Sequence, residues 1–352
     1  MWVPPPNLHP FPMDSLTQIV LGAAVSVAVM RRRTAVWKAA LWGGVAGTLP
    51  DLDVLIAHGD PILDMVLHRA ESHALFWLTL FSFPFAWLVA RVQGVQGDGA
   101  QLRWWWLAMW LALITHPLLD AFTVYGTQLW LPFSNYPVAL GSVFIIDPAV
   151  TLPWLIGLAV VLARRGDARG LRANAWGLAL GTAVLLLGVG LQARVEGLAR
   201  ASLAAQGVQP ERVLVTPAPL SMLLWRVVAV QGAAYYEGFH GLLDAPGAMH
   251  FDRFERGAAL EGAIAGIDGA QRIRHFSHGF YKLQETASGQ LVISDLRMGQ
   301  EPHYSFAFAV AQRSSPFAPL PLAQAVGGTG PVAPALAWLG RRMLGQPAPP
   351  PR

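Results

Sequence analysis

Six apolar segments constrain the fold of this chain more than any other feature of its sequence. They cover residues 16–30, 36–49, 74–90, 104–119, 149–163 and 175–193. A transmembrane helix needs roughly 20 apolar residues to cross a hydrocarbon core of about 30 Å, so each segment lies near the short end of the usable length. Charged residues make up only 13% of the chain, against roughly 25% in a soluble domain. We therefore expect an all-α polytopic membrane bundle of about six transmembrane helices, followed by a small soluble α+β domain.

The basic residues between these segments predict the topology. Ten Lys and Arg residues lie in the first, third and fifth connections, whereas the second carries only Arg69 and the fourth carries none. Because Lys and Arg accumulate in cytoplasmic loops, the odd connections belong in the cytoplasm and both chain termini outside it. We expect a multi-pass membrane protein with its C-terminal domain on the non-cytoplasmic side. The same topology accounts for the basic run Arg31–Arg33, so no nucleic-acid partner is expected.

Six His and Asp side chains fall at or near the ends of these segments, all on the side predicted to be non-cytoplasmic. They are Asp51, Asp53, His68, His73, His116 and Asp120. Ionisable groups at such places are costly and by default functional, with a partner to be named. The chain has no cysteine, so a metal here must take nitrogen and oxygen ligands. We expect these six residues to bind a divalent metal, zinc in the first place, with manganese or iron as alternatives.

The number of ligands leaves two arrangements open. A catalytic zinc usually takes three protein ligands and a water molecule, so a single ion would leave spare side chains to act as acid and base. Two ions about 3.5–4 Å apart would use all six side chains, as in many hydrolases. In both arrangements the metal activates water and polarises the bond to be cleaved.

Two pairs of these residues have spacings that suit a shared ion. His116 and Asp120 are four residues apart, which places them on one face of a helix. Asp51 and Asp53 follow Pro50, which favours the end of a helix, and carboxylates at this spacing can converge in a turn. Each pair also has a plainer interpretation. His116 and Asp120 could be a hydrogen-bonded pair that caps the helix, and Asp51 and Asp53 could be solvated or helix-capping aspartates.

The connection HRAESH at residues 68–73 supplies candidate catalytic residues. Arg69 could hold a phosphate or carboxylate of a substrate, Glu71 could act as a general base, and Ser72 could orient a histidine. Asp147 is a further candidate, because a carboxylate there could support the ligands. The plainer interpretations are an interfacial polar turn with Ser72 as its cap, and a helix cap at Asp147.

After about residue 200 the sequence changes character. Short β-rich runs at residues 213–217, 223–230, 289–298 and 304–311 alternate with turn clusters and mixed charges, as expected for half-buried strands. We expect a transmembrane domain over 13–200, a soluble α+β domain over 201–315 and a loosely ordered Pro- and Ala-rich tail over 316–352, in which residues 333–344 could form a short amphipathic helix. Residues 1–12 form a Pro-rich extension, and translation could start at Met1 or Met13.

Five motifs, taken in order, resemble a known family. They are MDSLTQIVLGAA at 13–24, LWGGVAGTLPDLD at 41–53, HRAESH at 68–73, THPLLDAFTVYGTQLWLPFS at 115–134 and FIIDP at 144–148. They are similar to motifs of the YdjM-like family of inner-membrane, metal-dependent hydrolases. The segments LLWRVVA and ISDLRMG more thinly resemble the C-terminal domain of its longer members. The resemblance implies the helical bundle and the metal site more firmly than any substrate. It also implies the bacterial inner membrane as the location, with the site and the C-terminal domain on the periplasmic side.

The chain departs from the family's pattern at one place. The family commonly reads HRGxSH or HRGxTH, whereas this chain has Ala70 and Glu71 in the middle of the motif. Both histidines are kept. The departure weakens the case for Glu71 as a general base.

These observations favour a membrane-embedded metal-dependent hydrolase that acts on a lipid or lipid-linked ester, phosphoesters included, at the non-cytoplasmic face. Membrane lipids are the expected partners, and the oligomeric state is left open. A transporter or metal-ion carrier is one alternative, although the sequence shows no inverted repeat. A lipid phosphatase with a histidine nucleophile is another, because such enzymes contain HxxxD, although their Lys and Arg phosphate-binding motifs are missing here.

Overall fold

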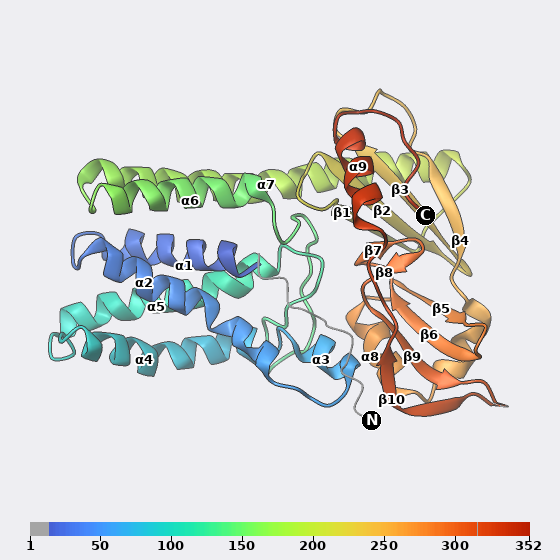
Figure 1. The fold of residues 1–352 in the computed structure, drawn as a ribbon, viewed down its shortest axis with the longest axis horizontal. Coiled ribbons are helices and arrows are strands. Elements are labelled where there is room, and N and C mark those ends of the chain that lie inside the picture. The colour runs from blue at the N-terminus through green and yellow to red at the C-terminus, as the bar shows by residue number, and fades with distance from the viewer. Residues whose placement is uncertain (1–13, 315) are drawn as a thin grey trace. The chain divides into compact units, whose positions relative to one another are not determined.

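Each of the six apolar segments forms a helix in the computed structural model (Figure 1). The helices are α1 (Asp14–Met30), α2 (Val36–Thr48), α4 (Leu75–Val92), α5 (Gly99–Asp120), α6 (Pro148–Ala163) and α7 (Ala168–Ala205). Between α2 and α4 lie the 3₁₀ turn η1 (Pro50–Leu55), the short helix α3 (Pro61–Leu67) and the 3₁₀ turn η2 (Glu71–His73). The structure describes residues 14–314 and 316–352. The Pro-rich extension at 1–12 and the choice between Met1 and Met13 therefore lie outside the described residues.

The chain divides into two structural units. One contains the described residues up to Ile56 together with Leu67–Gly188, and it is helical. The other contains Ala57–Val66 and Val189–Arg352, and it carries the β-sheets. A helical N-terminal half and a C-terminal β-sheet domain are thus confirmed. Helix α7 continues to Ala205, so it runs past the domain boundary expected near residue 200.

The expected number of about six transmembrane helices is wrong by length and composition. Among the helices of residues 14–314 and 316–352, only α4 and α7 are long and apolar enough to cross a membrane. Helices α1 and α6 are apolar but have 17 and 16 residues, which at about 1.5 Å per residue give roughly 25 Å. Helix α2 has 13 residues. Helix α5 has 22, but its four tryptophans, Arg103, His116 and Asp120 lower its hydropathy.

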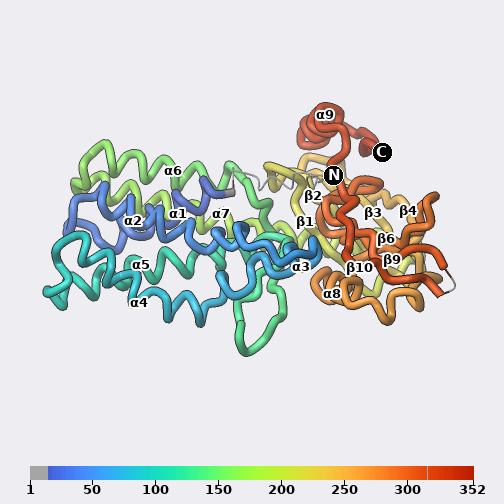
Figure 2. Tube along the Cα trace, turned by 60° about the horizontal axis from the view of Figure 1, so that its bottom comes forward, coloured from blue at the N-terminus to red at the C-terminus, as the bar shows by residue number. Residues whose placement is uncertain are grey.

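Helices α1 and α2 pack with their backbones in contact, side by side in Figures 1 and 2. A Cβ atom on Gly22 would lie 2.3 Å from the carbonyl oxygen of Gly43, and one on Gly47 would lie 2.5 Å from that of Gln18. Small residues at a helix crossing allow this close approach. The crossing brings the end of α2, and η1 after it, next to α5.

The C-terminal unit contains two antiparallel four-stranded sheets. The first has the order β1 (Arg212–Pro217), β2 (Leu224–Gln231), β3 (Ala234–Gly241) and β4 (Phe251–Glu255), and the second β10 (Ala318–Ala325), β9 (Ala307–Gln312), β6 (Gln290–Asp295) and β5 (Tyr281–Glu285). A small ribbon of β7 (Gly299–Gln300) and β8 (His303–Tyr304), the turn η3 (Ala258–Ile264) and helices α8 (Asp268–Phe276) and α9 (Val332–Met343) complete the unit. The four predicted β-rich runs overlap β1, β2, β6 and β9.

The tail expected to be loosely ordered is instead part of this unit. Strand β10 pairs with β9, and its prolines are tolerated because β10 is the edge strand of its sheet. Helix α9 covers residues 332–343, close to the amphipathic helix considered for 333–344. It buries Trp338 and Leu339 against Leu224 of β2. The sequence bias toward Pro and Ala therefore hid the edge strand, whereas the helix considered for residues 333–344 is present.

Candidate metal centre

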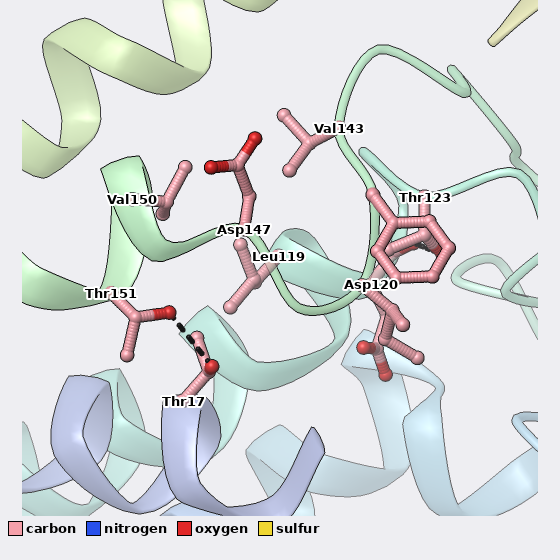
Figure 3. A pocket seen from close by; sticks show the side chains of 10 residues that line it. Thr17, Leu119, Asp120, Thr123, Val143, Asp147, Val150 and Thr151 are labelled. Carbon is pink, nitrogen blue, oxygen red and sulfur yellow. Dashed lines mark hydrogen bonds between the residues drawn. The ribbon is translucent and has the colours of Figure 1, made fainter. Parts of the chain in front are cut away.

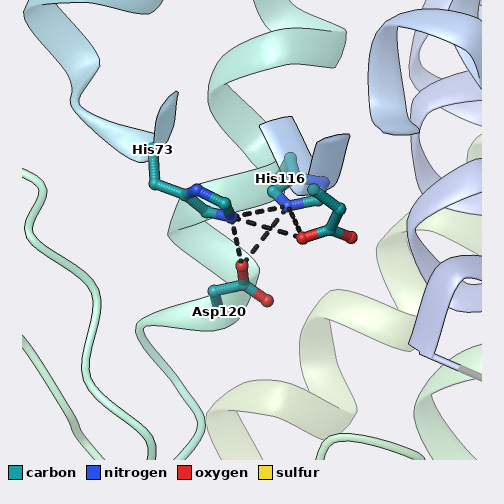
Figure 4. Close-up of side chains that lie close together, drawn as sticks. His73, His116 and Asp120 are labelled. Atoms are coloured by element: carbon teal, nitrogen blue, oxygen red, sulfur yellow. Dashed lines mark hydrogen bonds and ion pairs between the residues drawn. The ribbon is translucent and has the colours of Figure 1, made fainter. Parts of the chain in front are cut away.

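Four of the six predicted ligands lie together in the helical unit. His116 and Asp120 come from the last turns of α5, Asp51 from η1 and His73 from the end of η2. One donor atom of each lies within 4.8 Å of the donor atoms of the others. Figure 4 shows the His73 and His116 rings and the Asp120 carboxylate turned toward one another. Three chain segments, up to 69 residues apart in sequence, thus converge on one small space.

Five of the six separations between the donor atoms lie between 3.1 and 3.4 Å. The Nε2 atoms of His73 and His116 are 3.1 Å apart. Asp51 Oδ1 lies 3.4 Å from the first of these atoms and 3.2 Å from the second. Asp120 Oδ2 lies 3.3 Å from both. Zinc binds imidazole nitrogen and carboxylate oxygen at about 2.0–2.1 Å in a tetrahedron, whose edges are then about 3.3–3.4 Å.

One buried oxygen of this group lacks the hydrogen-bond partner that it would need without a cation. Asp120 is buried, and its Oδ2 has no hydrogen-bond partner in the described part of the chain. Two imidazole nitrogens and two carboxylate oxygens facing one space repel each other unless a proton or a cation lies between them. The residues therefore fit a divalent cation. We name the group Asp51, His73, His116 and Asp120 the four-ligand cluster.

The far side of each histidine ring is held by a second contact. His116 Nδ1 donates to the backbone carbonyl of Gly47 at 2.6 Å. His73 Nδ1 lies 2.8 Å from Ser72 Oγ, and that hydroxyl donates to Asp53 Oδ2 at 2.6 Å. With Nδ1 protonated in each ring, both Nε2 atoms present lone pairs to the cluster, as metal-binding histidines do. Ser72 thus holds the orienting place suggested for it by the sequence.

Asp53 and His68, also predicted as ligands, lie beside the cluster and pair with each other. His68 Nδ1 is 2.9 Å from Asp53 Oδ1, and the backbone N–H of Arg69 donates to Asp53 Oδ2 at 3.0 Å. Burial alone would raise the pKa of Asp53, but the hydrogen bond and charge of His68 outweigh it and lower that pKa below its usual value. Asp53 therefore stays ionised and acts on His73 through Ser72.

Arg69 lies against a ligand rather than in open solvent. Its buried guanidinium is 3.3 Å from Asp120 Oδ1 and donates to Thr123 Oγ1 at 3.2 Å. Its φ of 65° is in the left-handed region, where a residue other than glycine is strained. Strain of this kind clusters at functional sites. A role in binding a substrate anion stays a prediction.

Two further contacts support the site, and one of them, at Thr123, was missed from the sequence. Gln18 of α1 donates to Asp120 Oδ1 at 3.0 Å and to the carbonyl oxygen of His116 at 3.3 Å. Thr123 receives the hydrogen bond from Arg69. The sequence places Gln18 at the start of the first helix, on the side of the predicted ligands, where a cap of that helix was favoured over a place at the site.

The other two candidate catalytic residues occupy different surroundings. Glu71 begins η2 with its side chain exposed, whereas His73 two residues later is buried. Asp147 caps α6, accepting a hydrogen bond from the Ala149 N–H at 2.8 Å. Its second oxygen, Oδ2, is buried without a hydrogen-bond partner among the described residues, and burial raises its pKa.

Asp147 also lines a small cavity next to the cluster (Figure 3). Asp120, Thr123, Thr17 and Thr151 line the same cavity, and the two hydroxyls of Thr17 and Thr151 are 2.9 Å apart. The cavity measures about 10 Å³, which is about the space of one water molecule. The sequence alternatives of a helix cap and a site carboxylate therefore both have a structural counterpart.

Comparisons with known proteins agree with the motifs. The sequence model of the family described as YdjM inner membrane protein matches residues 13–196. The uncharacterized protein YfhP of Bacillus subtilis (strain 168) is 29% identical over 158 residues, which cover 42% of this chain and 46% of YfhP. The chain thus matches less than half the length of that relative. No solved structure matches the chain significantly. Because the family match extends over more than half of its residues, the chain belongs to the YdjM family of inner membrane proteins.

Proposed function

We propose that this protein is a membrane-embedded hydrolase that uses one divalent metal, zinc in the first place. The observation that carries the proposal is the four-ligand cluster, in which each histidine nitrogen lies 3.1–3.4 Å from the other nitrogen and from both carboxylate oxygens. Nitrogen and carboxylate donors in this number and spacing suit zinc. The separate pairing of Asp53 with His68 favours one ion over two.

The exposures of the four ligands suggest different roles. The side chains of His73, His116 and Asp120 are at most 2% exposed, whereas that of Asp51 is 22% exposed. Two histidines and a carboxylate are a ligand set of catalytic zinc sites, which keep one position open. We assign the three buried side chains to metal binding and Asp51 to the open side.

A bound divalent cation supplies Lewis acidity, which lowers the pKa of a water molecule and polarises an ester. The protein's own residues do the rest. Asp51 accepts a proton from water at the exposed side of the cluster. Arg69 and Gln18 hold Asp120 through its second oxygen, and Ser72 holds His73.

The substrate class follows from the surroundings. The family is one of inner membrane proteins, and α4 and α7 are long and apolar enough to cross a bilayer. The distribution of Lys and Arg favours the non-cytoplasmic, periplasmic face for the cluster. A site at this face of the membrane is accessible to lipids. We therefore assign a lipid or lipid-linked ester, phosphoesters included, as the substrate.

The test measures turnover and metal content on the same preparations. Full-length protein is incubated with bacterial lipid extract, with a chelator and after addition of Zn²⁺. We expect hydrolysis that the chelator abolishes and zinc restores. Asp51→Asn should keep the metal and lose turnover by about 10²-fold or more, the range for loss of a general base. The matched control is Asp64→Asn, at an exposed carboxylate outside the helical unit.

Four results would contradict the assignment. Turnover that survives the chelator would exclude metal-dependent hydrolysis. Loss of metal in Asp51→Asn would make Asp51 a fourth ligand and the cluster a closed, structural site. Uptake of metal into proteoliposomes without hydrolysis would favour a metal-ion carrier, and a covalent phosphohistidine at His116 or His73 would favour a histidine-nucleophile phosphatase.

A further inference from the structure

Four exposed leucines stand on three turns of the C-terminal unit. Leu220 and Leu223 belong to the turn between β1 and β2, Leu243 follows β3, and Leu344 follows α9. Their exposed fractions run from 41% to 70%. Single exposed leucines are ordinary, but several on adjoining turns form a patch that marks an interaction surface. We name these four residues the leucine rim.

The three turns adjoin one another. The N–H of Leu242 donates to the carbonyl oxygen of Leu223 at 2.8 Å, which joins the first two turns. Arg342 of α9 donates to both oxygens of Asp244 at 2.8–2.9 Å, which joins the second to the third. A Cβ atom on Gly345 would lie 2.5 Å from the carbonyl oxygen of Leu243. The rim is therefore one continuous edge, built over buried Leu224 and Trp338.

The leucine rim lies near the end of the uncharged stretch of α7, which indicates that the rim faces the membrane surface. Helix α7 carries no charged residue between Arg172 and Arg194, and it is a candidate transmembrane helix. Gln192, just before the end of this uncharged stretch, donates to the carbonyl oxygen of Val215 in β1 at 2.8 Å. The N–H of Met249 donates to Ser202 Oγ, near the C-terminal end of α7, at 2.9 Å. Strand β1 thus passes the level of Gln192, and the turn that follows it lies close to where the uncharged stretch ends.

Basic residues accompany the rim. Arg194 and Arg341 are exposed. Arg194 lies close enough to the end of β3 to act on His240, whose pKa is lowered by burial and, to a smaller extent, by Arg342 and Arg194. Exposed leucines beside Arg residues are typical of surfaces that lie in the interfacial layer of a bilayer, with apolar tips among the acyl chains and cations among the phosphates.

We propose that the leucine rim inserts into the headgroup region of the leaflet at which α7 leaves the bilayer, and holds the C-terminal unit against the membrane surface. The occupant of the rim is lipid. The inference rests on α7 crossing the membrane and is independent of the metal centre. Its success or failure therefore says nothing about hydrolysis.

The absence of cysteine from the chain allows a direct test by single-site labelling. Leu243→Cys carries an environment-sensitive fluorophore in the full-length protein, reconstituted in nanodiscs of phosphatidylcholine and phosphatidylglycerol in which a fraction of lipids carries a shallow quencher. Ser288→Cys, in the exposed turn between β5 and β6 of the other sheet, is the matched control. Leu344→Cys is a second rim site in case the first variant fails to fold.

We expect the lipid quencher to reduce fluorescence severalfold more at residues 243 and 344 than at residue 288. Leu220→Asp, introduced beside Leu243→Cys, should bring the quenching down toward that of the control. Equal quenching at rim and control would overturn the proposal. A rim label shielded from aqueous iodide but untouched by the lipid quencher would also overturn it, and would assign the rim to a second copy or another protein.

Discussion

His73 and His116 each use both ring nitrogens, one toward the cluster and one toward an orienting partner. His73 depends for this on Ser72, which relays the charge of Asp53. Partners of this kind fix the tautomer of the ring, and their loss typically lowers metal affinity by about 10–100-fold. At the residue scale, metal binding therefore depends on the contacts that orient each histidine ring as well as on the ligands themselves.

Ser72→Ala should therefore bind zinc about 10–100-fold more weakly than the wild type. The protein should still fold, because Ser72 is only part-buried. Competition with a zinc-chelating dye measures the affinity, with Ser288→Ala as the control at an exposed turn. Unchanged affinity in Ser72→Ala would show that the relay from Asp53 has no part in metal binding.

Asp147 gives a prediction about pH at the same scale. Its folded-state pKa is raised by burial, so its ionised form costs stability, and the cost grows as pH rises from the unfolded carboxyl value of about 3.9 through the folded value. Asp147→Asn keeps the helix cap and removes the charge, so its melting temperature should exceed that of the wild type, with a larger margin at about pH 8 than at about pH 5. Asp147→Ala should lose about 1 kcal/mol with the cap. A difference in melting temperature between Asp147→Asn and the wild type that shrinks as pH rises would contradict the prediction that ionised Asp147 destabilises the fold.

At the scale of elements, the turn η1 decides which aspartate faces the cluster. A 3₁₀ turn has about three residues per turn, so side chains two apart point in different directions. Asp51 accordingly faces His73 and His116, and Asp53 faces His68. The sequence predicted six ligands because spacing alone does not tell a 3₁₀ turn from a converging loop. His116 and Asp120 were predictable, because helix geometry fixes residues four apart.

The crossing of α1 and α2 places both Gly47 and Gln18 at the cluster, so it should be sensitive to a single methyl group. In Gly47→Ala the new Cβ would lie 2.5 Å from the backbone oxygen of Gln18, which forces the helices apart and moves the carbonyl that His116 uses. We expect a lower melting temperature and loss of bound zinc. Gly190→Ala is the control, because its Cβ meets no atom within 4 Å and helix propensity favours alanine by about 1 kcal/mol. Equal behaviour of the two variants would show that the crossing does not support the site.

At the scale of the whole molecule, the sequence predicted the order of helices, sheets and motifs better than it predicted how the membrane is crossed. Each apolar segment became a helix, but α1, α2 and α6 are short, and length is what spanning requires. The contact of Gln18 with Asp120 joins residues 102 positions apart, and no periodicity in one sequence encodes such a pairing.

Orientation in the membrane is a prediction for the whole chain that labelling can test. Gly97→Cys, between α4 and α5, should be cytoplasmic, because Arg91 and Arg103 flank that connection. Ser134→Cys should be periplasmic, because no Lys or Arg lies between α5 and α6. This outcome requires α5 to cross the bilayer despite its low hydropathy. A membrane-impermeant maleimide added to intact cells should therefore label residue 134 and leave residue 97 unlabelled until the cells are lysed. The reverse pattern would place the cluster at the cytoplasmic face.

The central claim is that His73, His116 and Asp120 bind one divalent cation, with Asp51 at its open side, and the metal content of purified variants tests this claim most directly. The wild type should hold about one zinc per chain by elemental analysis. His116→Ala should hold almost none. His68→Ala should keep its metal, because His68, although also predicted as a ligand from the sequence, pairs with Asp53 instead. Absence of stoichiometric metal from the wild type, or equal loss from the two variants, would contradict the account.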